Sequence, residues 1–529
     1  MKSGARYFVW WILAVLIALG FELCFANFEA YRWKNVAENL LFATGMLLTI
    51  PLFNSRKIKG ILADSYFVFF VLCLFLESAF FYLFHTNFSA SAIYILIETN
   101  AAESREFLGF YLDVPIICFF LALLLLCFLY FKRRKNIFRK YSLRVKAMSL
   151  SLLVGLLIFM KFSGMIDPNL PYLVGISIWD YSHEKSKMEA FNIDKPTGNF
   201  EEVNFQGKFK KNLFVLVIGE STTKRNFGLY GYYRNTTPKL KEIENELLVY
   251  WNVISPHAFT IGALQEALTL NNFQKSDESS LVQLMNQAGF KTFWLSNQRP
   301  IGPYESLVTK ISKASNVVEF TNSAIAGSVT PYDEVLLSYF EKALADSAEN
   351  KFIVLHILGT HMQYKNRYPE NFDFFKDQPQ SNFEDELAHS RINSYDNAIR
   401  YMDSFLRQVI EMSRDKHVPS YVLYFSDHGE EVYHNRYFAG HLDENPTKDM
   451  FEVPFILWRS EEFKKQDFIF EENLKTPYSM GDFIYSFADL SQIDFAGMNE
   501  EKSIFSEQFQ PKKRKVGDGL DFDIYFEKD

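Results

Sequence analysis

Two segments in the second half of the chain place acidic and imidazole side chains directly after apolar runs typical of buried strands. In Asn212–Arg225 (NLFVLVIGESTTKR) the run breaks at Gly219 and Glu220 follows. In the segment SYVLYFSDHGE, Asp427 and His428 follow in the same manner. The loops beyond the carboxyl ends of strands in open α/β sheets converge over a crevice that binds ligands. Oxygen and imidazole ligands suit Zn²⁺, so a metal site is expected if the two strands are neighbours.

Each segment also has a purely structural interpretation. Glu220 lies beside Ser221, Thr222 and Thr223, and such residues often cap the first amides of a helix. The stretch Asp427–Glu430 favours a metal ligand more strongly, because a strand that ends in DHG leaves polar groups that need a partner.

Thr260 is a candidate nucleophile in the stretch SPHAFTIGALQEALTL, where it opens a helical pattern. Helix N-termini attract anions through their free amides and dipole. A hydroxyl beside a metal can lose its proton near neutral pH, as metal-bound water does. From this stretch alone, the simpler interpretation is that Thr260 is only an N-cap residue.

Histidines follow two further strand-like segments. His361 follows the run in FIVLHILGTH, and His441 lies in the polar loop AGHLDENPTKDMFEVPF. Both loops are expected to overhang the same crevice, which favours a role in the site for these two. His356 lies within its strand and is expected to be a core histidine with satisfied ring nitrogens, whereas His257 and His434 receive no role.

The residues after Asn212 alternate short apolar runs with amphipathic stretches. This alternation predicts an α/β domain with a mainly parallel central sheet covered by helices. The expected strands are Leu213–Ile218, Phe290–Leu295, Phe352–Ile357, Tyr421–Phe425 and Val453–Trp458, and the expected helices include Gly262–Leu270, Tyr332–Ala345 and Asn393–Met412.

The first third of the chain predicts a membrane domain. It holds five apolar runs close to the ~20 residues that cross a bilayer. These runs are Tyr7–Ala26, Val36–Phe53, Tyr66–Phe84, Val114–Phe131 and Ala147–Phe162. The second is short and carries Glu38, and the first has the basic start of a signal peptide but is too long and is followed by further spans.

Lysine and arginine bias predicts the orientation of these spans. The basic segments Lys132–Lys146 and Ser55–Lys59 are expected to face the cytoplasm, although Arg32 and Lys34 run mildly against this arrangement. Everything after about Ser163 then lies outside, which in a Gram-negative cell is the periplasm. The net charge of −8 offers no footprint for nucleic acid, and all 4 cysteines lie in the expected spans.

A candidate interfacial helix precedes the fourth span. Residues 91–110 have amphipathic spacing that includes Thr99, Glu103 and Glu106, and their acids suit a cationic head group. The expected organisation is therefore a transmembrane domain over 1–164 with this helix near 91–110, a connector over 165–211, and a catalytic domain over 212–529.

Together these motifs resemble the bacterial phosphoethanolamine transferases, inner-membrane enzymes with five spans and a periplasmic alkaline-phosphatase-like domain. The resemblance is carried by VIGEST, FGLYGYYRNTTPKL, Thr260, LGTHMQYKNRYP, SDHGE and FEVPFILW, in order along essentially the whole chain. It implies transfer of phosphoethanolamine from phosphatidylethanolamine, with release of diacylglycerol, to lipopolysaccharide, lipid A or another envelope acceptor.

The resemblance also implies roles for individual residues. Glu220, Asp427, His428 and Thr260 match the zinc ligands, and Thr260 also matches the nucleophile that carries the covalent intermediate. His361 and His441 match histidines that bind a second zinc or the substrate phosphate. Thr99 and Glu103 match head-group-binding residues, whereas Ile95 stands where better-known members have an asparagine.

The chain departs from the disulfide-rich lipid A branch, because its soluble part has no cysteine and reads GALQEALTL after Thr260. It looks nearer to the branch that acts on lipopolysaccharide core sugars or other surface acceptors. The alternatives are a phosphoglycerol transferase or a sulfatase-like hydrolase on the same fold, or a non-catalytic membrane scaffold. The acids Glu103 and Glu106 disfavour an anionic head group, and no cysteine or serine suited to formylglycine is apparent in the nucleophile motif.

Overall fold

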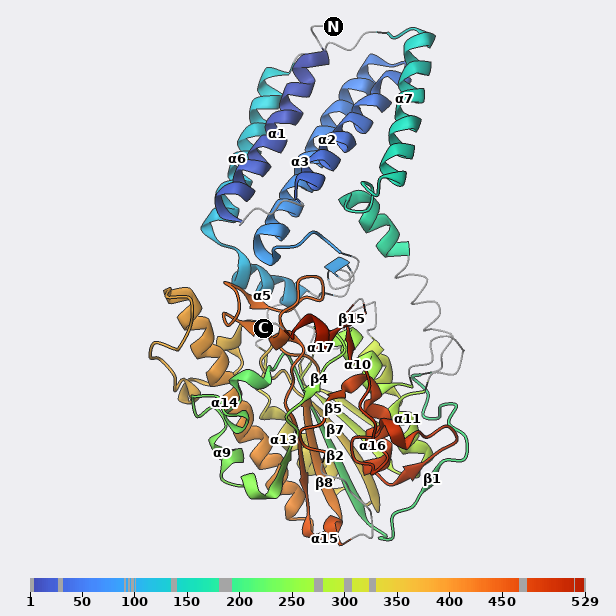
Figure 1. The fold of residues 1–529 in the computed structure, drawn as a ribbon, viewed down its shortest axis with the longest axis vertical. Coiled ribbons are helices and arrows are strands. Elements are labelled where there is room, and N and C mark those ends of the chain that lie inside the picture. The colour runs from blue at the N-terminus through green and yellow to red at the C-terminus, as the bar shows by residue number, and fades with distance from the viewer. Residues whose placement is uncertain are drawn as a thin grey trace. The chain divides into compact units, whose positions relative to one another are not determined.

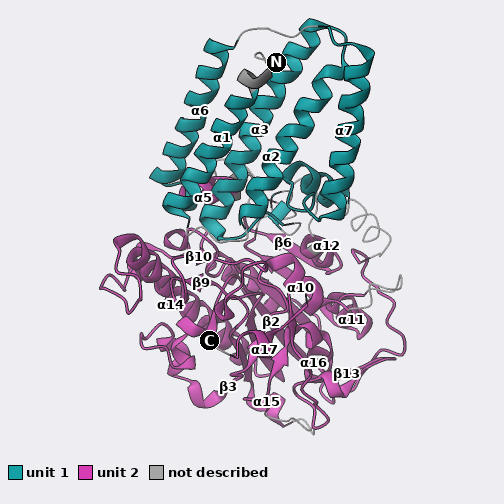
Figure 2. Cartoon of the chain, turned by 45° about the horizontal axis from the view of Figure 1, so that its top comes forward, with its two compact units in different colours: residues 1–97, 111–184 teal, residues 98–110, 185–529 magenta. Residues whose placement is uncertain are grey.

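The computed structural model describes residues 4–26, 32–89, 92–93, 96, 99, 101–134, 140–179, 193–270, 279–298, 307–322, 330–465, 473–517 and 519–527. The chain divides into two compact units, Met1–Ile97 with Tyr111–Glu184, and Glu98–Phe110 with Lys185–Asp529 (Figure 2). The short stretch Glu98–Phe110 therefore groups with the second unit, whereas the sequence places it in the membrane domain. The end of the expected connector also belongs to the second unit.

Within the described residues, the first unit contains five helices that are long and apolar enough to cross a membrane. They are α1 (Gly4–Phe25), α2 (Arg32–Thr49), α3 (Arg56–Phe84), α6 (Val114–Arg133) and α7 (Leu143–Phe162). Buried apolar side chains of α1, α2, α3 and α6 form one cluster around Trp11, Phe67 and Phe70. Ser55 caps α3, so the basic residues expected in a loop there lie in the first turn of the helix.

Glu38, the acid that weakens the second span, is fully buried in this unit. Asn169 donates a hydrogen bond of 2.6 Å to its carboxylate. Polar residues inside a membrane helix are tolerated where they face the bundle interior and find a polar partner. The acid is therefore compatible with a membrane span.

The second unit is built on a seven-stranded sheet with the strand order β3-β11-β8-β2-β7-β5-β6. Its strands are β2 (Asn212–Gly219), β3 (Leu247–Val249), β5 (Lys291–Ser296), β6 (Val317–Phe320), β7 (Asn350–His356), β8 (Ser420–Ser426) and β11 (Phe455–Arg459). The strands β8, β2, β7, β5 and β6 pair in parallel, whereas β11 is antiparallel to β8 and β3. The expected mainly parallel sheet is confirmed, and its last expected strand begins two residues later.

Helices cover both faces of this sheet (Figure 1). One face packs against α10 (Thr260–Leu268), α11 (Leu281–Gln287), α12 (Leu307–Lys313) and α16 (Phe483–Leu490). The other packs against α9 (Pro238–Lys241), α13 (Val335–Ala345) and α14 (Glu386–Arg414). Successive residues of β2 enter the two cores in turn, because side chains alternate across a strand. A strand buried on both faces reads as a continuous apolar run, as β2 does from Leu213 to Ile218.

Some helix bounds differ from expectation for local reasons. The helix α14 begins at Glu386, seven residues before the expected start, because Asp385 caps it by accepting from the amides of Leu387 and Ala388. The helix α10 ends at Leu268 because Thr269 is extended and forms a β-bridge with Ser280.

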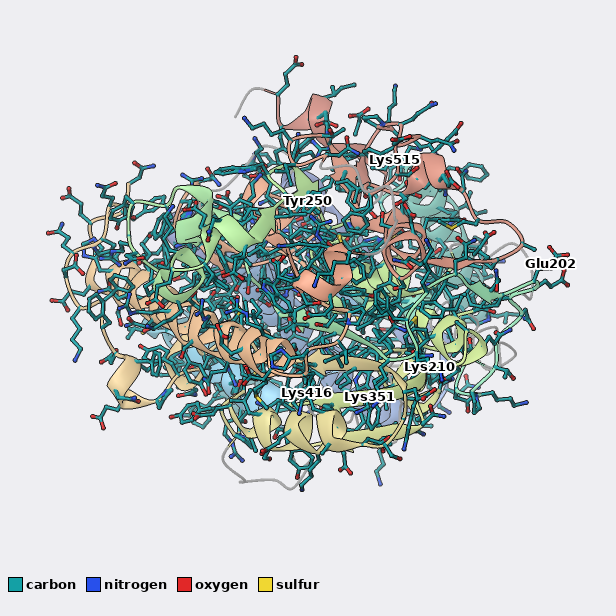
Figure 3. All side chains as sticks on the ribbon, turned by 90° about the horizontal axis from the view of Figure 1, so that it is seen from below. Glu202, Lys210, Tyr250, Lys351, Lys416 and Lys515 are labelled. Carbon is teal, nitrogen blue, oxygen red and sulfur yellow. The ribbon has the colours of Figure 1, made fainter. Side chains whose placement is uncertain are left out.

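Side chains of opposite charge lie at the two ends of the parallel strands. Lys351 at the start of β7 and Lys416 before β8 mark the amino-terminal edge (Figure 3). Partial burial and the nearby positive charge of Lys416 lower the pKa of Lys351 although Asp346 opposes the shift. The acids of the candidate site follow the opposite, carboxyl-terminal edge.

Short elements complete the second unit. They are α5 (Ala101–Tyr111, whose last residue is assigned to the first unit), α15 (Glu461–Lys464), α17 (Phe522–Tyr525) and the two-residue strands β1 (Asn204–Phe205), β4 (Val253–Ile254), β9 (Glu431–Val432), β10 (Ala439–Gly440), β12 (Tyr478–Ser479), β13 (Ile493–Asp494), β14 (Lys515–Val516) and β15 (Leu520–Asp521).

Candidate metal centre

The strands that deliver Glu220 and Asp427 are neighbours in the sheet. β2 pairs with β8 in parallel, and Gly219 lies opposite Ser426 in the last step of the register. The amide of Asp427 donates to the carbonyl oxygen of Gly219 at 3.2 Å. Because both strands end at the same edge of the sheet, Glu220 and Asp427 lie side by side just beyond it.

Glu220, Asp427 and His428 form one buried cluster. Their candidate ligand atoms all lie within 4.8 Å of one another. His428 Nε2 is 3.4 Å from Glu220 Oε1 and 3.4 Å from Asp427 Oδ2. The fold therefore brings together three of the four residues expected to bind the zinc, with the fourth, Thr260, beside them.

The backbone around the cluster is tightly constrained. Ser221 has a positive φ of 54°, a conformation that L residues rarely adopt and that is concentrated at functional sites. At Gly429, a Cβ atom would lie 2.1 Å from the carbonyl oxygen of Asp449, so only glycine fits after the Asp-His pair. These backbone constraints at Ser221 and Gly429 restrict where the neighbouring Glu220 and His428 side chains can lie.

The polar atoms of the cluster fit a metal ion. Asp427 Oδ2 and His428 Nε2 are buried and have no hydrogen-bond partner among the described residues. His428 Nδ1 lies 2.8 Å from the carbonyl oxygen of Gly429, which directs Nε2 toward the acids. A metal-bound histidine typically donates its other ring nitrogen to such an acceptor. The chemistry of the donor set suits Zn²⁺.

The charges of the cluster favour a cation. Burial opposes protonation of His428, but Asp427 and Glu220 outweigh it and raise its pKa to about 10. Burial and the charge of Glu220 raise the pKa of Asp427. Burial also disfavours the ionised Glu220, but the His428 imidazole 3.4 Å away, with smaller contributions from His361 and His356, holds its pKa below the usual range. A positive charge at this position is thus strongly stabilised.

Thr260 is the first residue of α10 and faces the cluster. Its hydroxyl Oγ1 lies 3.3 Å from Glu220 Oε1 and 3.5 Å from Oε2. The N-cap position belongs to Phe259, and no side chain caps this helix. The simpler interpretation of Thr260 as an N-cap is therefore wrong.

His441 lies next to the cluster because a hairpin returns it there. β9 pairs with β10, with Gly440 opposite Glu431. His428, Glu430 and His441 form a second group of candidate ligands within 4.8 Å of one another. Glu430 Oε2 lies 2.6 Å from His441 Nδ1. Glu430 is a residue that the sequence analysis did not single out, although it stands in the SDHGE motif.

His361 also lies in the loop after β7, as expected, but it belongs to neither group of candidate ligands among the described residues. Its Nδ1 is buried without a hydrogen-bond partner among the described residues, and the proximity of His361 helps to lower the pKa of Glu220. Its expected role with a second metal or the substrate phosphate stays a prediction.

His356 differs from expectation, and His257 has partners that the sequence did not predict. His356 is a core histidine, and burial lowers its pKa to about 4, but its Nε2 has no hydrogen-bond partner among the described residues and its Nδ1 is 3.4 Å from Ser296 Oγ. His257, which received no role, lies 2.8 Å from Asp443 Oδ2 and 3.4 Å from Glu266 Oε1. Burial opposes its protonation, but these two carboxylates raise its pKa to about 9.

Gln298 is a further residue that the sequence analysis missed. Its Nε2 donates to Glu220 Oε2 at 3.1 Å and to the carbonyl oxygen of Ile357 at 3.0 Å. It comes from the loop after β5, so it holds the Glu220 carboxylate from across the sheet edge. No motif in the sequence marks it.

The expected donor-binding residues lie at or before the start of α5. Thr99 is partly buried. Glu103 is in the helix, but its side chain lies outside the described part of the structure, and so does Ile95. Glu106, the second acid considered for a head group, pairs instead with Arg367.

The class of the second unit follows from a family model. Residues 212–493 match the sulfatase family, which covers the sheet and both strand ends of the cluster. The full-length lipooligosaccharide phosphoethanolamine transferase A from Neisseria meningitidis has the same fold, with a TM-score of 0.67, 20% identity, and 93% of this chain and 95% of that chain covered. The expected five-helix membrane part and alkaline-phosphatase-like domain are confirmed.

Phosphoethanolamine transferase EptC of Escherichia coli is 31% identical over 520 residues, covering 92% of this chain and 89% of that protein. The chain belongs to the phosphoethanolamine transferase family. The crystal structure of the periplasmic domain of the Escherichia coli protein, in complex with Zn, matches with a TM-score of 0.59 and 32% identity, covering 62% of this chain and 97% of that one.

Proposed function

We propose that this protein transfers phosphoethanolamine from phosphatidylethanolamine to lipopolysaccharide, lipid A or another envelope acceptor at the periplasmic face of a bacterial inner membrane. The observation that carries the proposal is the position of Thr260, whose hydroxyl faces the Glu220–Asp427–His428 cluster at the start of a helix. A relative that shares the fold is a lipooligosaccharide phosphoethanolamine transferase, which supports an acceptor of this class.

Glu220, Asp427, His428 and Thr260 would hold a zinc ion. When bound, the ion would supply positive charge that lowers the pKa of a hydroxyl and polarises a phosphoryl oxygen. The orphaned atoms of Asp427 and His428 support this assignment. His361 and His441 would bind a second metal or the substrate phosphate.

The reaction would proceed by two displacements at phosphorus. Thr260 Oγ1 attacks the phosphorus of the donor, the bond to the diacylglycerol oxygen breaks, and diacylglycerol leaves with a proton. The product is a phosphoethanolamine ester of Thr260. An acceptor hydroxyl or phosphate oxygen then attacks the same phosphorus, and the threonine oxygen is released. In our proposal His441, oriented by Glu430, stabilises or protonates the departing oxygen.

Glu103 would bind the ethanolammonium group of the donor, supported by Thr99. Its neighbour Glu106 is not free for that role because it pairs with Arg367. We expect Glu103→Gln to raise the KM for phosphatidylethanolamine while zinc content stays at the wild-type level, because the charge is lost and the shape is kept. Steady-state kinetics with a short-chain donor in detergent measure this effect. Unchanged KM and kcat would remove Glu103 from the donor site.

The proposed function is tested by reconstituting the full-length protein in vesicles that contain phosphatidylethanolamine labelled in its ethanolamine group, together with lipopolysaccharide. We expect the label to appear on lipopolysaccharide and diacylglycerol to accumulate in equal amount. Vesicles that offer phosphatidylglycerol as the sole donor should give no transfer. Transfer from phosphatidylglycerol instead, or hydrolysis without an acceptor product, would favour the phosphoglycerol transferase or the hydrolase.

A further inference from the structure

The short helix α5 is seated on the catalytic unit by buried polar contacts. Arg367, whose side chain is 2% exposed, pairs with Glu106, and Gln363 Nε2 donates to the carbonyl oxygen of Glu106 at 2.8 Å. A Cβ atom on Gly109 would lie 3.1 Å from Gln363 Nε2, so the helix approaches this loop closely. The Glu106 side chain is 21% exposed, but breaking the pair would leave the buried Arg367 guanidinium without its counter-charge, which is costly.

The carboxyl end of α5 is held as firmly. Arg391 donates to the carbonyl oxygen of Phe110, and its guanidinium lies 3.7 Å from the centroid of the Phe110 ring. A cation at the carboxyl end of a helix satisfies its free carbonyl groups and complements its dipole. The position of Phe110 is therefore set by contacts that do not involve the candidate metal centre.

From Phe110, direct contacts lead to the metal centre. The ring of Phe110 meets the edge of Tyr364 at a centroid distance of 5.4 Å. The hydroxyl of Tyr364 donates to Glu430 Oε1 at 2.5 Å, and Glu430 Oε2 lies 2.6 Å from His441 Nδ1. All three of Tyr364, Glu430 and Phe110 are at least partly buried. The Glu430 carboxylate, which contacts both Tyr364 and His441, therefore connects α5 to a candidate catalytic histidine.

A second series of contacts leads from Tyr364 to the loop that follows Glu220. Tyr364 packs edge-on against Tyr395 at 4.9 Å. The hydroxyl of Tyr395 donates to the carbonyl oxygen of Ser221 at 2.8 Å and accepts from the amide of Thr223 at 2.9 Å. These residues form the loop directly after Glu220. Tyr364 thus supports both the His441 hairpin and the Glu220 loop.

We propose that Phe110 and Tyr364 are positioning residues, and that the seating of α5 sets the orientation of His441 through Tyr364 and Glu430. Only Leu112 and Asp113 separate α5 from the candidate membrane span α6, so this chain of contacts couples the catalytic centre to a segment anchored at the membrane. The inference rests on the proposed function and adds that α5 acts on the catalytic geometry itself, beyond any contact with the lipid donor.

The test uses the full-length zinc-loaded protein with a soluble chromogenic donor, p-nitrophenyl phosphoethanolamine, which has no acyl chains. We expect Phe110→Ala and Tyr364→Phe each to lower kcat for this donor about 10-fold with little change in KM, the size of effect seen when a group that orients a metal-site ligand is removed. The double variant should be no worse than the more severe single variant, because both changes interrupt one chain of contacts.

Matched controls separate positioning from general damage. Leu108→Ala shortens an exposed apolar side chain on the same helix, and Tyr368→Phe removes a buried hydroxyl that donates to Asp373 in the neighbouring loop. Both should retain wild-type kcat. Tyr364→Phe keeps the ring and its packing, so normal zinc content and an unchanged melting temperature are expected for it even where Phe110→Ala loses stability.

Wild-type kcat for the soluble donor in Tyr364→Phe, or in a folded Phe110→Ala, would overturn the proposal. Loss confined to phosphatidylethanolamine would also overturn it, because α5 would then serve only lipid binding. A wild-type protein that turns over the soluble ester but transfers nothing from phosphatidylethanolamine would contradict the proposed function instead. The two failures are therefore distinguishable.

Discussion

Thr260→Ala is expected to abolish transfer, with a loss of at least about 10⁴-fold in kcat, because it removes the proposed nucleophile. The hydroxyl faces Glu220 and caps no helix, so the cost in folding free energy should stay below the ~1 kcal/mol of a lost N-cap. Transfer from phosphatidylethanolamine measures the first effect, and thermal unfolding of the same preparation measures the second.

A direct observation of the intermediate gives the control for this experiment. Wild-type protein supplied with donor and no acceptor should gain the mass of one phosphoethanolamine unit, and peptide mapping should place it on Thr260. The alanine variant should gain nothing. An adduct on Thr222, Thr223 or Ser255 would show that another hydroxyl is the nucleophile.

Asp427→Asn is expected to lower zinc affinity by orders of magnitude and to abolish transfer with it. The substitution keeps the shape of the side chain and removes a charge whose Oδ2 accepts no hydrogen bond from the residues that the structure describes. A catalytic zinc has few protein ligands, so the loss of one carboxylate weakens binding strongly. Elemental analysis of the purified full-length variant, after dialysis against a series of zinc buffers, measures the change.

Asp396→Asn is the matched control. Asp396 is also fully buried, but it pairs with Arg234 at 2.9 Å and belongs to neither candidate ligand group. Its substitution should lower stability, because it leaves Arg234 without a buried counter-charge, and should leave zinc content per folded molecule unchanged. A folded, unchelated wild-type protein without zinc would contradict the metal assignment.

The fold was predictable because its signal is local. Each central strand is a short apolar run that ends in a turn or a polar cluster, and runs buried on both faces read as continuous apolar segments. The five candidate spans are recognisable for the same reason, since length and apolarity decide membrane insertion. The positions of helix ends were predicted less accurately, because a cap such as Asp385 is a single residue and gives only a weak signal in the sequence.

The sequence by itself determined which residue types stand at the carboxyl ends of β2 and β8, and a parallel sheet brings such ends to one edge. That is why Glu220, Asp427 and His428 were identifiable as a group. Their contribution to a metal site depends on the order of strands, and only the tertiary structure showed that β2 and β8 are adjacent.

Only the tertiary structure also decided the partners of the supporting side chains. Glu430 meets His441 through a hairpin, Gln298 reaches Glu220 from another strand end, and Glu106 pairs with Arg367. The last two of these contacts join residues separated by 78 and 261 positions, and such pairs have no periodicity in the sequence that could reveal them. They form because a buried charged or polar group needs a hydrogen-bond partner. The fold brings together segments that are distant in the sequence, and these supply the partners.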